Sequence, residues 1–262
     1  MLPSECLYQQ YEEERDFSVP AVYPGKLLGH PPLLKRFFMA RFDQIGTATI
    51  PGKGTQLRLL RRNDEFSIRI AGSAGELMNS RLHGSEDALA TLACERLADH
   101  AAPRILIGGL GMGFTLAAAL AAVGPDAEVV VAELVPEVEA WNRGPLGEAA
   151  GYPLHDPRAR VHIGDVADLI RSSQHSWDAI LLDVDNGPEG LTRKENDWLY
   201  TAAGIAAAQA AMTPEGVLAY WSAGQDPAFT ERLRRAGLSV DPVTVRAHRP
   251  GKGARHVIWL AW

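Results

Sequence analysis

From residue 104 onward, short apolar runs alternate with stretches whose apolar positions recur at helical spacing. This pattern predicts strands joined by helices, and such alternation indicates a parallel sheet covered on both faces, with right-handed crossovers. The predicted strands are 104–109 (RILIGG), 127–134 (AEVVVAEL), 160–165 (RVHIGD), 177–184 (WDAILLDV) and 216–223 (GVLAYWSA), and the clearest helices are 115–123, 165–171, 194–212 and 227–236.

Two further strands are predicted at 238–246 (LSVDPVTVR) and 255–262 (RHVIWLAW). The polar loop between them, 247–254, is too short for a crossover helix, so these two strands should pair antiparallel. The expected fold class is therefore α/β: a doubly wound, seven-stranded, mostly parallel sheet.

The chain ahead of this sheet has a different character. Residues 45–78 hold short strand-like runs separated by PGKG, RND and GSAG, which predicts a small antiparallel β-hairpin domain. A helix with Ser85 as its N-cap should follow. The first 45 residues are broken by prolines and read as an arm with one helical candidate at 32–42. We expect two domains, 1–80 with the arm and small sheet and 81–262 with the large sheet. The first is a candidate surface for a homodimer.

Composition and charge narrow the classes of partner. Hydrophobic residues make up 46% and charged residues 22%, the balance of an ordinary soluble globular protein. The net charge of -6 disfavours a nucleic-acid partner, and no leader or membrane-spanning run is visible, so we expect a cytoplasmic protein without a membrane partner. The two cysteines and the histidines show no metal-ligand spacing, so no metal is expected.

Residues 108–113 read GGLGMG and follow the first predicted strand of the large sheet. Glycines there let backbone N–H groups approach an anionic ligand at a helix start, and a plain turn is the alternative. Gly109, Gly111 and Gly113 form GxGxG. Phe114 stands where the dinucleotide fingerprint needs a small residue, which disfavours a nicotinamide or flavin cofactor.

Acidic residues stand at the ends of the next three predicted strands. Glu133 lies about twenty residues after the glycine turn, where a carboxylate can accept both hydroxyls of a ribose. Asp165, followed by Val166, suits the exocyclic amine of an adenine, with a helix N-cap as the alternative role. Asp183 ends the strand after that. Together these residues predict a nucleoside site at one edge of the sheet.

The order of these motifs resembles the class I S-adenosylmethionine-dependent methyltransferase fold, and residues 77–221 are similar to the spermidine synthase-like family. The matching segments are LM with HGSEDALA, ILIGGLGMG, VVVAELVPEV, DPRARVHIGDVADLI and WDAILLDV. The resemblance implies Asp183 as the catalytic residue and a sulfonium nucleoside bound by Gly109, Gly111, Gly113, Glu133, Asp165 and Val166.

The sequence departs from the family at the glycine turn. Aminopropyltransferases carry GGGDGG, whose aspartate faces the amine of decarboxylated S-adenosylmethionine, and Gly111 takes that position here. A bare helix start favours the carboxylate of ordinary S-adenosylmethionine, so a small-molecule methyltransferase is the first expectation. Three alternatives stay open: transfer of the aminocarboxypropyl arm, a polyamine aminopropyltransferase that uses the decarboxylated cofactor, and a nucleoside-binding module without catalysis.

A second departure follows the fourth strand, where the family pattern DxxDP is replaced by Asp183-Val184-Asp185-Asn186. This change puts a diamine site in doubt. Asp185, Asn186 and Tyr200 are candidates for an acceptor pocket, with an Asx turn as the alternative for the first two and helix packing for Tyr200.

The segment ahead of the large sheet adds two more candidates for the acceptor pocket. His83 and Glu86 loosely match a His-Glu pair at the family's cleft, with a loop histidine before a capped helix as the alternative. The acidic character of these candidates favours a small-molecule amine as acceptor.

Overall fold

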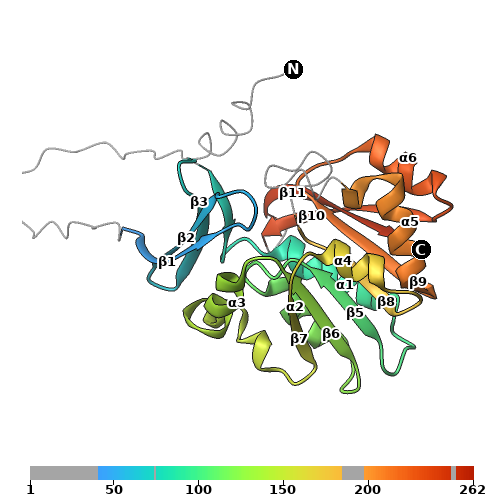
Figure 1. The fold of residues 1–262 in the computed structure, drawn as a ribbon, viewed down its shortest axis with the longest axis horizontal. Helices are drawn as coiled ribbons and strands as arrows, with labels where there is room; N and C mark the ends of the chain where they lie inside the picture. Colours follow the sequence, from blue (N-terminus) through green and yellow to red (C-terminus); the bar gives the residue numbers. More distant parts are fainter. Residues whose placement is uncertain (1–40, 74, 185–197, 249–251) are drawn as a thin grey trace, which may run out of the picture. The chain divides into compact units, whose positions relative to one another are not determined.

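The computed structural model describes residues 41–73, 75–184, 198–248 and 252–262 (Figure 1). All of them belong to one compact unit, residues 40–262. Asp185 and Asn186 lie outside the described residues. The described part of the chain contains no helix with the length and hydrophobicity needed to cross a membrane.

A small antiparallel sheet comes first along the sequence, as the hairpin-like runs predict. Its strands, in spatial order β1-β2-β3-β4, are Asp43–Thr49, Gln56–Arg62, Glu65–Ile70 and Glu76–Asn79. Leu57 and Leu59 alternate with exposed arginine along β2, so one face of this sheet is buried. That face shares one hydrophobic core with the helices on one side of the large sheet.

The strand β1 packs on the helix α3, Pro136–Arg143. Gly46 lies against the indole of Trp141, and a Cβ at position 46 would stand 2.7 Å from the Trp141 Nε1. The close approach of strand and ring therefore requires glycine at this position.

The large sheet has the order β10-β11-β9-β8-β5-β6-β7, which confirms the predicted seven-stranded, doubly wound fold. Every pair from β7 to β9 is parallel, and β11 runs antiparallel to both of its neighbours. The strands are β5 (Arg104–Gly108), β6 (Glu128–Glu133), β7 (Ala159–Ile163), β8 (Trp177–Leu182), β9 (Met212–Ser222), β10 (Val240–His248) and β11 (Lys252–Ala261).

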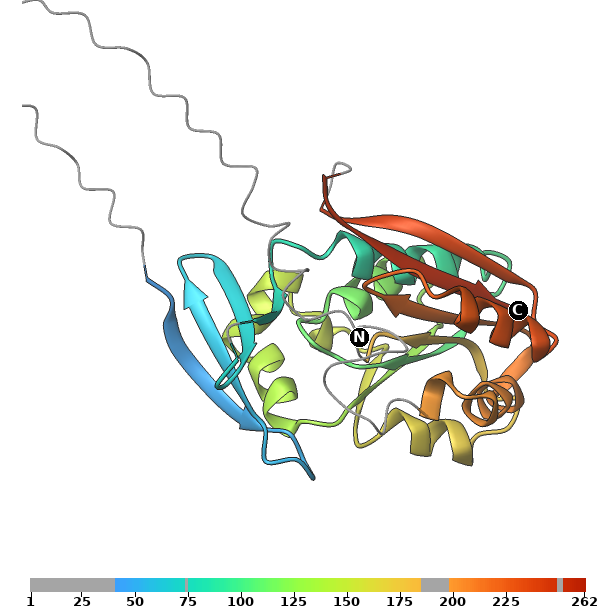
Figure 2. The ribbon, with the colours of Figure 1, turned by 90° about the horizontal axis from the view of Figure 1, so that it is seen from above.

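Helices cover both faces of this sheet, as Figure 2 shows. Successive residues of the strands face opposite cores: Ile105 and Ile107 pack with α1 and α2, whereas Leu106 packs with α4 and α5. The helices are α1 (Gly84–Glu95), α2 (Phe114–Ala122), α3 (Pro136–Arg143), α4 (Val166–Ser172), α5 (Ala202–Ala211) and α6 (Pro227–Arg235), and short 3-10 turns cover Pro145–Ala150 and Pro153–His155.

Two helix starts differ from the predictions. The N-cap of α1 is His83, without a side-chain capping bond, so the expectation that Ser85 caps this helix is wrong. Ser85 lies inside the first turn, where its buried hydroxyl contacts side chains instead of the backbone. The described part of the predicted helix 194–212 begins only at Ala202, because Thr201 caps it through the N–H of Gly204.

Candidate functional site

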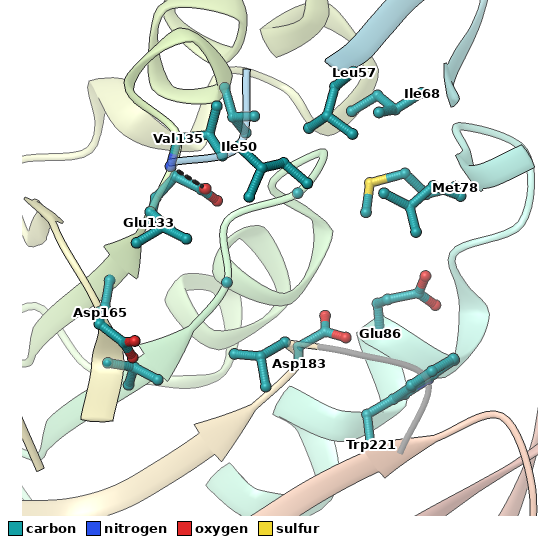
Figure 3. Close-up of a pocket in the computed structure, with 18 of the residues that line it drawn as sticks. Ile50, Leu57, Ile68, Met78, Glu86, Glu133, Val135, Asp165, Asp183 and Trp221 are labelled. Atoms are coloured by element: carbon teal, nitrogen blue, oxygen red, sulfur yellow. Dashed lines mark hydrogen bonds between the residues drawn. The ribbon is translucent and has the colours of Figure 1, made fainter. Parts of the chain in front are cut away.

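A cavity lies at the carboxyl ends of β5, β6 and β8, beside the small sheet (Figure 3). Glu133 and Asp165 lie on one side of it in Figure 3, Glu86 and Trp221 lie on the other, and Asp183 is between them. Its apolar wall comes from residues at the small sheet, namely Ile50, Leu57, Ile68, Leu77 and Met78. Ligands of doubly wound folds bind at this edge of the sheet.

The glycine turn, residues 108–113, forms part of the cavity wall through Gly109 and Gly111. Gly109 has a φ of +90°, and a Cβ there would overlap the carbonyl oxygen of Asp183. Gly111 has a φ of +51°, and a Cβ there would stand 3.2 Å from the Met78 Sδ. Gly113 is the N-cap of α2 and does not line the cavity. The turn thus brings bare backbone to a ligand space.

Glu133 ends β6, where it is buried and fixes the glycine turn. Its carboxylate accepts hydrogen bonds from the N–H of Leu110 at 3.0 Å and from that of Val135 at 2.8 Å. Burial raises the pKa of Glu133, and donation from the backbone N–H groups of Val135 and Leu110 opposes this shift. The glycine turn is therefore not wholly open to a ligand, because the N–H of Leu110 already donates to a carboxylate.

Asp165 caps α4, so the alternative role weighed for it is confirmed. Its Oδ1 accepts a hydrogen bond from the N–H of Ala167 at 2.9 Å. Asp165 and Val166 also line the cavity. A carboxylate has about four lone-pair directions, so a capping bond leaves capacity to accept from a ligand amine.

Two carboxyl groups, Asp183 and Glu86, form what we call the carboxylate pair. Asp183 follows β8 and accepts a hydrogen bond from the Thr115 hydroxyl at 2.7 Å. Its side chain is partly open to the cavity but removed from bulk water, and this burial raises the pKa of Asp183 to about 6. Burial, and then the charge of Asp183, raise the pKa of Glu86 to about 7. Both pKa values lie near neutrality, which suits groups that take up a proton.

Trp221 is a cavity residue that the sequence analysis missed. It lies near the end of β9 and is only 9% exposed, and its Nε1 has no hydrogen-bond partner among the residues described. Its position near the end of a predicted strand is the same signal that identified Asp183, but an aromatic residue there is equally consistent with core packing.

Other predicted site residues lie elsewhere. The His83 ring stacks on Phe114, with ring centroids 4.1 Å apart, and its Nδ1 lies 2.9 Å from the Asp87 Oδ2. Tyr200 is buried beside Tyr220 and Phe229. Neither His83 nor Tyr200 lines the cavity. The described ranges contain no group of three or more His, Cys, Asp and Glu side chains placed to hold a metal ion.

Comparison with solved structures identifies similar folds. A spermidine synthase in complex with the transition-state analogue AdoDATO matches with a TM-score of 0.61 at 17% identity, over 85% of this chain and 73% of that one. The spermidine synthase of Thermotoga maritima gives a TM-score of 0.60 at 17% identity, over 85% and 74%. A probable spermidine synthase from Corynebacterium glutamicum gives 0.56 at 18% identity, over 82% and 79%.

These likenesses establish a spermidine synthase-like fold, which confirms the resemblance at the level of the fold. No protein-family model matches the chain, and no curated protein matches its sequence.

Proposed function

We propose that this protein is a transferase that moves a group from a sulfonium nucleoside of the S-adenosylmethionine class to an amine, with aminopropyl transfer as the first candidate. One observation carries the proposal. The described residues that line the cavity include four carboxyl groups, Glu86, Glu133, Asp165 and Asp183, and no Lys, Arg or His. Such a cavity favours cationic ligands at both ends.

The residues on one side of the cavity fit the nucleoside. Glu133 suits the ribose hydroxyls, Asp165 suits the exocyclic amine of adenine, and the turn at Gly109 and Gly111 leaves space for the tail. When bound, this nucleoside supplies a carbon activated by the adjacent sulfonium, so the protein's task is to place the acceptor and remove its proton.

The carboxylate pair suits the acceptor. An alkylammonium group must lose a proton before its nitrogen can act as a nucleophile, and Asp183, with a pKa of about 6, can accept that proton near neutral pH. Glu86 then holds a cationic acceptor by charge, and the Trp221 ring provides an apolar wall for its carbon chain. The spermidine synthases named above support aminopropyl transfer as the reaction.

Methyl transfer from ordinary S-adenosylmethionine is the second candidate, and the glycine turn favours it. Position 111 carries no carboxylate that would attract a cationic tail, and the Met78 thioether lies where such a side chain would project. Against it, the N–H of Leu110 in the glycine turn already donates to Glu133 and so is not open to the carboxylate of that cofactor.

Calorimetric titration with S-adenosylmethionine and with its decarboxylated form decides between the candidates. We expect the decarboxylated form to bind at least about tenfold more tightly, which corresponds to about 1.4 kcal/mol. The opposite preference would reject aminopropyl transfer and leave methyl transfer. Turnover is then assayed with a panel of amines and diamines. Nucleoside binding without turnover of any amine would reject both reactions and leave a binding module.

A further inference from the structure

We infer that Ser85 and His256 are positioning residues for Glu86: a hydrogen-bonded chain from β11 holds the Glu86 carboxyl group in the cavity, directed at the acceptor. The expected effect on kinetics rests on the proposed function. The hydrogen bonds among His256, Ser85 and Glu86 do not depend on it.

The middle link of this hydrogen-bonded chain is the Ser85 hydroxyl, which is fully buried in the first turn of α1. The hydroxyl donates a hydrogen bond to the Glu86 Oε2 at 2.6 Å, and the His256 Nδ1 lies 2.8 Å from the same Oγ. A hydroxyl has only one proton to donate. Because Ser85 gives that proton to Glu86, the His256 Nδ1 must carry a proton and donate it to the Ser85 Oγ.

His256 also contacts the second cavity residue on this side. Its ring meets that of Trp221 edge-on, with centroids 4.7 Å apart. A single histidine outside the cavity thus supports both Glu86 and Trp221, which line it. Burial lowers the pKa of His256, which keeps the ring neutral at neutral pH. A neutral donor can orient a carboxylate without neutralising its charge.

Titratable groups on three elements act on Glu86. Asp183 faces it from the end of β8 and opposes its ionisation, whereas His83 at the start of α1 favours ionisation. His256 reaches it from β11 through Ser85. β10 also packs on α1 and carries Arg246, whose guanidinium donates to the carbonyl of Gly253. The Ser85 bond therefore lowers the Glu86 pKa, against burial and the charge of Asp183, which both raise it.

The test is a carboxyl ¹³C NMR titration of the full chain without ligand, with the Glu86 signal assigned by its loss in Glu86→Gln. Ser85→Ala and His256→Phe each remove one link, and Phe keeps an aromatic ring against Trp221. His256→Asn is the matched control, because its amide N–H takes about the place of the Nδ1–H. Circular dichroism and thermal melts confirm that each variant is folded.

We expect the Glu86 pKa to rise by about one unit in Ser85→Ala and by a smaller amount in His256→Phe, because a donor to the ionised form is lost or weakened. His256→Asn should stay close to the parent protein. An unchanged Glu86 pKa in Ser85→Ala, or an Asn variant that matches the Phe variant, would overturn the inference.

Kinetics then separate this inference from the proposed function. If aminopropyl transfer is detected, the acid limb of kcat/KM should move to higher pH in Ser85→Ala and His256→Phe, as the Glu86 pKa does. A shifted Glu86 pKa in a protein that turns over no amine would uphold the positioning and reject the proposed reaction. Turnover of an amine together with an unshifted Glu86 pKa would uphold the proposed reaction and reject the positioning role of Ser85 and His256.

Discussion

Single residues carry the chemistry proposed for this protein, and Asp183 is the central one. It lies between the two sides of the cavity in Figure 3 and accepts the Thr115 hydroxyl. Its backbone packs directly on Gly109 of the glycine turn, which fixes its place beside that turn.

Asp183→Asn should lower kcat by about 10² to 10⁴, the usual contribution of a general base. The Kd for the nucleoside should change less than about threefold, because the amide keeps the size of the side chain. Turnover and calorimetric binding measured on the same preparation check both statements. Unchanged turnover would remove Asp183 from the proposed mechanism.

The raised pKa of Glu86 leads to a prediction about the pH dependence of stability. Its pKa is raised to about 7 in the folded protein, so the folded state binds the proton more tightly than the unfolded chain does. The free energy of unfolding therefore falls as pH rises from about 4.5 to about 7. Since Glu86 is partly exposed, we expect Glu86→Gln to stabilise the protein by about 1–2 kcal/mol at pH 8 and to have little effect at pH 4. Urea unfolding at both pH values measures this difference, and an equal effect at both would contradict the raised pKa.

Among the elements, the join between β1 and α3 sets where the small sheet lies at the cavity. Gly46 has no left-handed backbone conformation, and the atoms nearest to a Cβ there all belong to the ring of Trp141. The hairpin pattern predicts a strand close to β1 but not its contact with α3, because nothing local in a hairpin run specifies which ring it will meet.

Gly46→Ala should cost about 1–3 kcal/mol of the free energy of unfolding, the usual penalty of overpacking. Gly224→Ala is the matched control, since a Cβ there meets nothing within 4 Å, and it should be neutral or slightly stabilising. Chemical denaturation of both variants provides the comparison. Trp141→Phe should relieve part of the penalty in the double variant, and full additivity would argue against the contact.

Local patterns were sufficient for much of the molecule. The alternation of strands and helices predicts the large sheet, and residues at successive strand ends, such as Glu133 and Asp183, do line one cavity. The predictions that fail are those that depend on contacts between residues far apart in the sequence. Ser85 was expected to cap a helix, but its partner is His256, 171 positions later.

At the scale of the whole molecule, net charge affects how strongly the proposed acceptor is attracted to the protein. The chain carries a net charge of -6, and the cavity lining concentrates four of its carboxyl groups. A cationic acceptor is therefore attracted both at long range and at the site, and salt weakens only the long-range part strongly.

We expect the KM for a dicationic amine to rise severalfold between 50 and 500 mM NaCl, as the Debye length falls from about 14 Å to about 4 Å. The Kd for the uncharged 5′-methylthioadenosine should change much less. Steady-state kinetics and calorimetry at both salt concentrations test this contrast. A salt-independent KM would argue against a cationic acceptor.

The positions of the cavity residues along the sequence also determine which side of the cavity can form first during synthesis on the ribosome. Glu133, Asp165 and Val166 are present once the first two thirds of the chain have been made, and their strands β5, β6 and β7 are consecutive neighbours. Glu86 is made earlier than any of them, yet the histidine that supports it belongs to β11, which inserts between β9 and β10. A nascent chain can therefore complete the side of the cavity with Glu133 and Asp165 well before the side with Glu86, which is complete only after the strand that carries His256 has emerged.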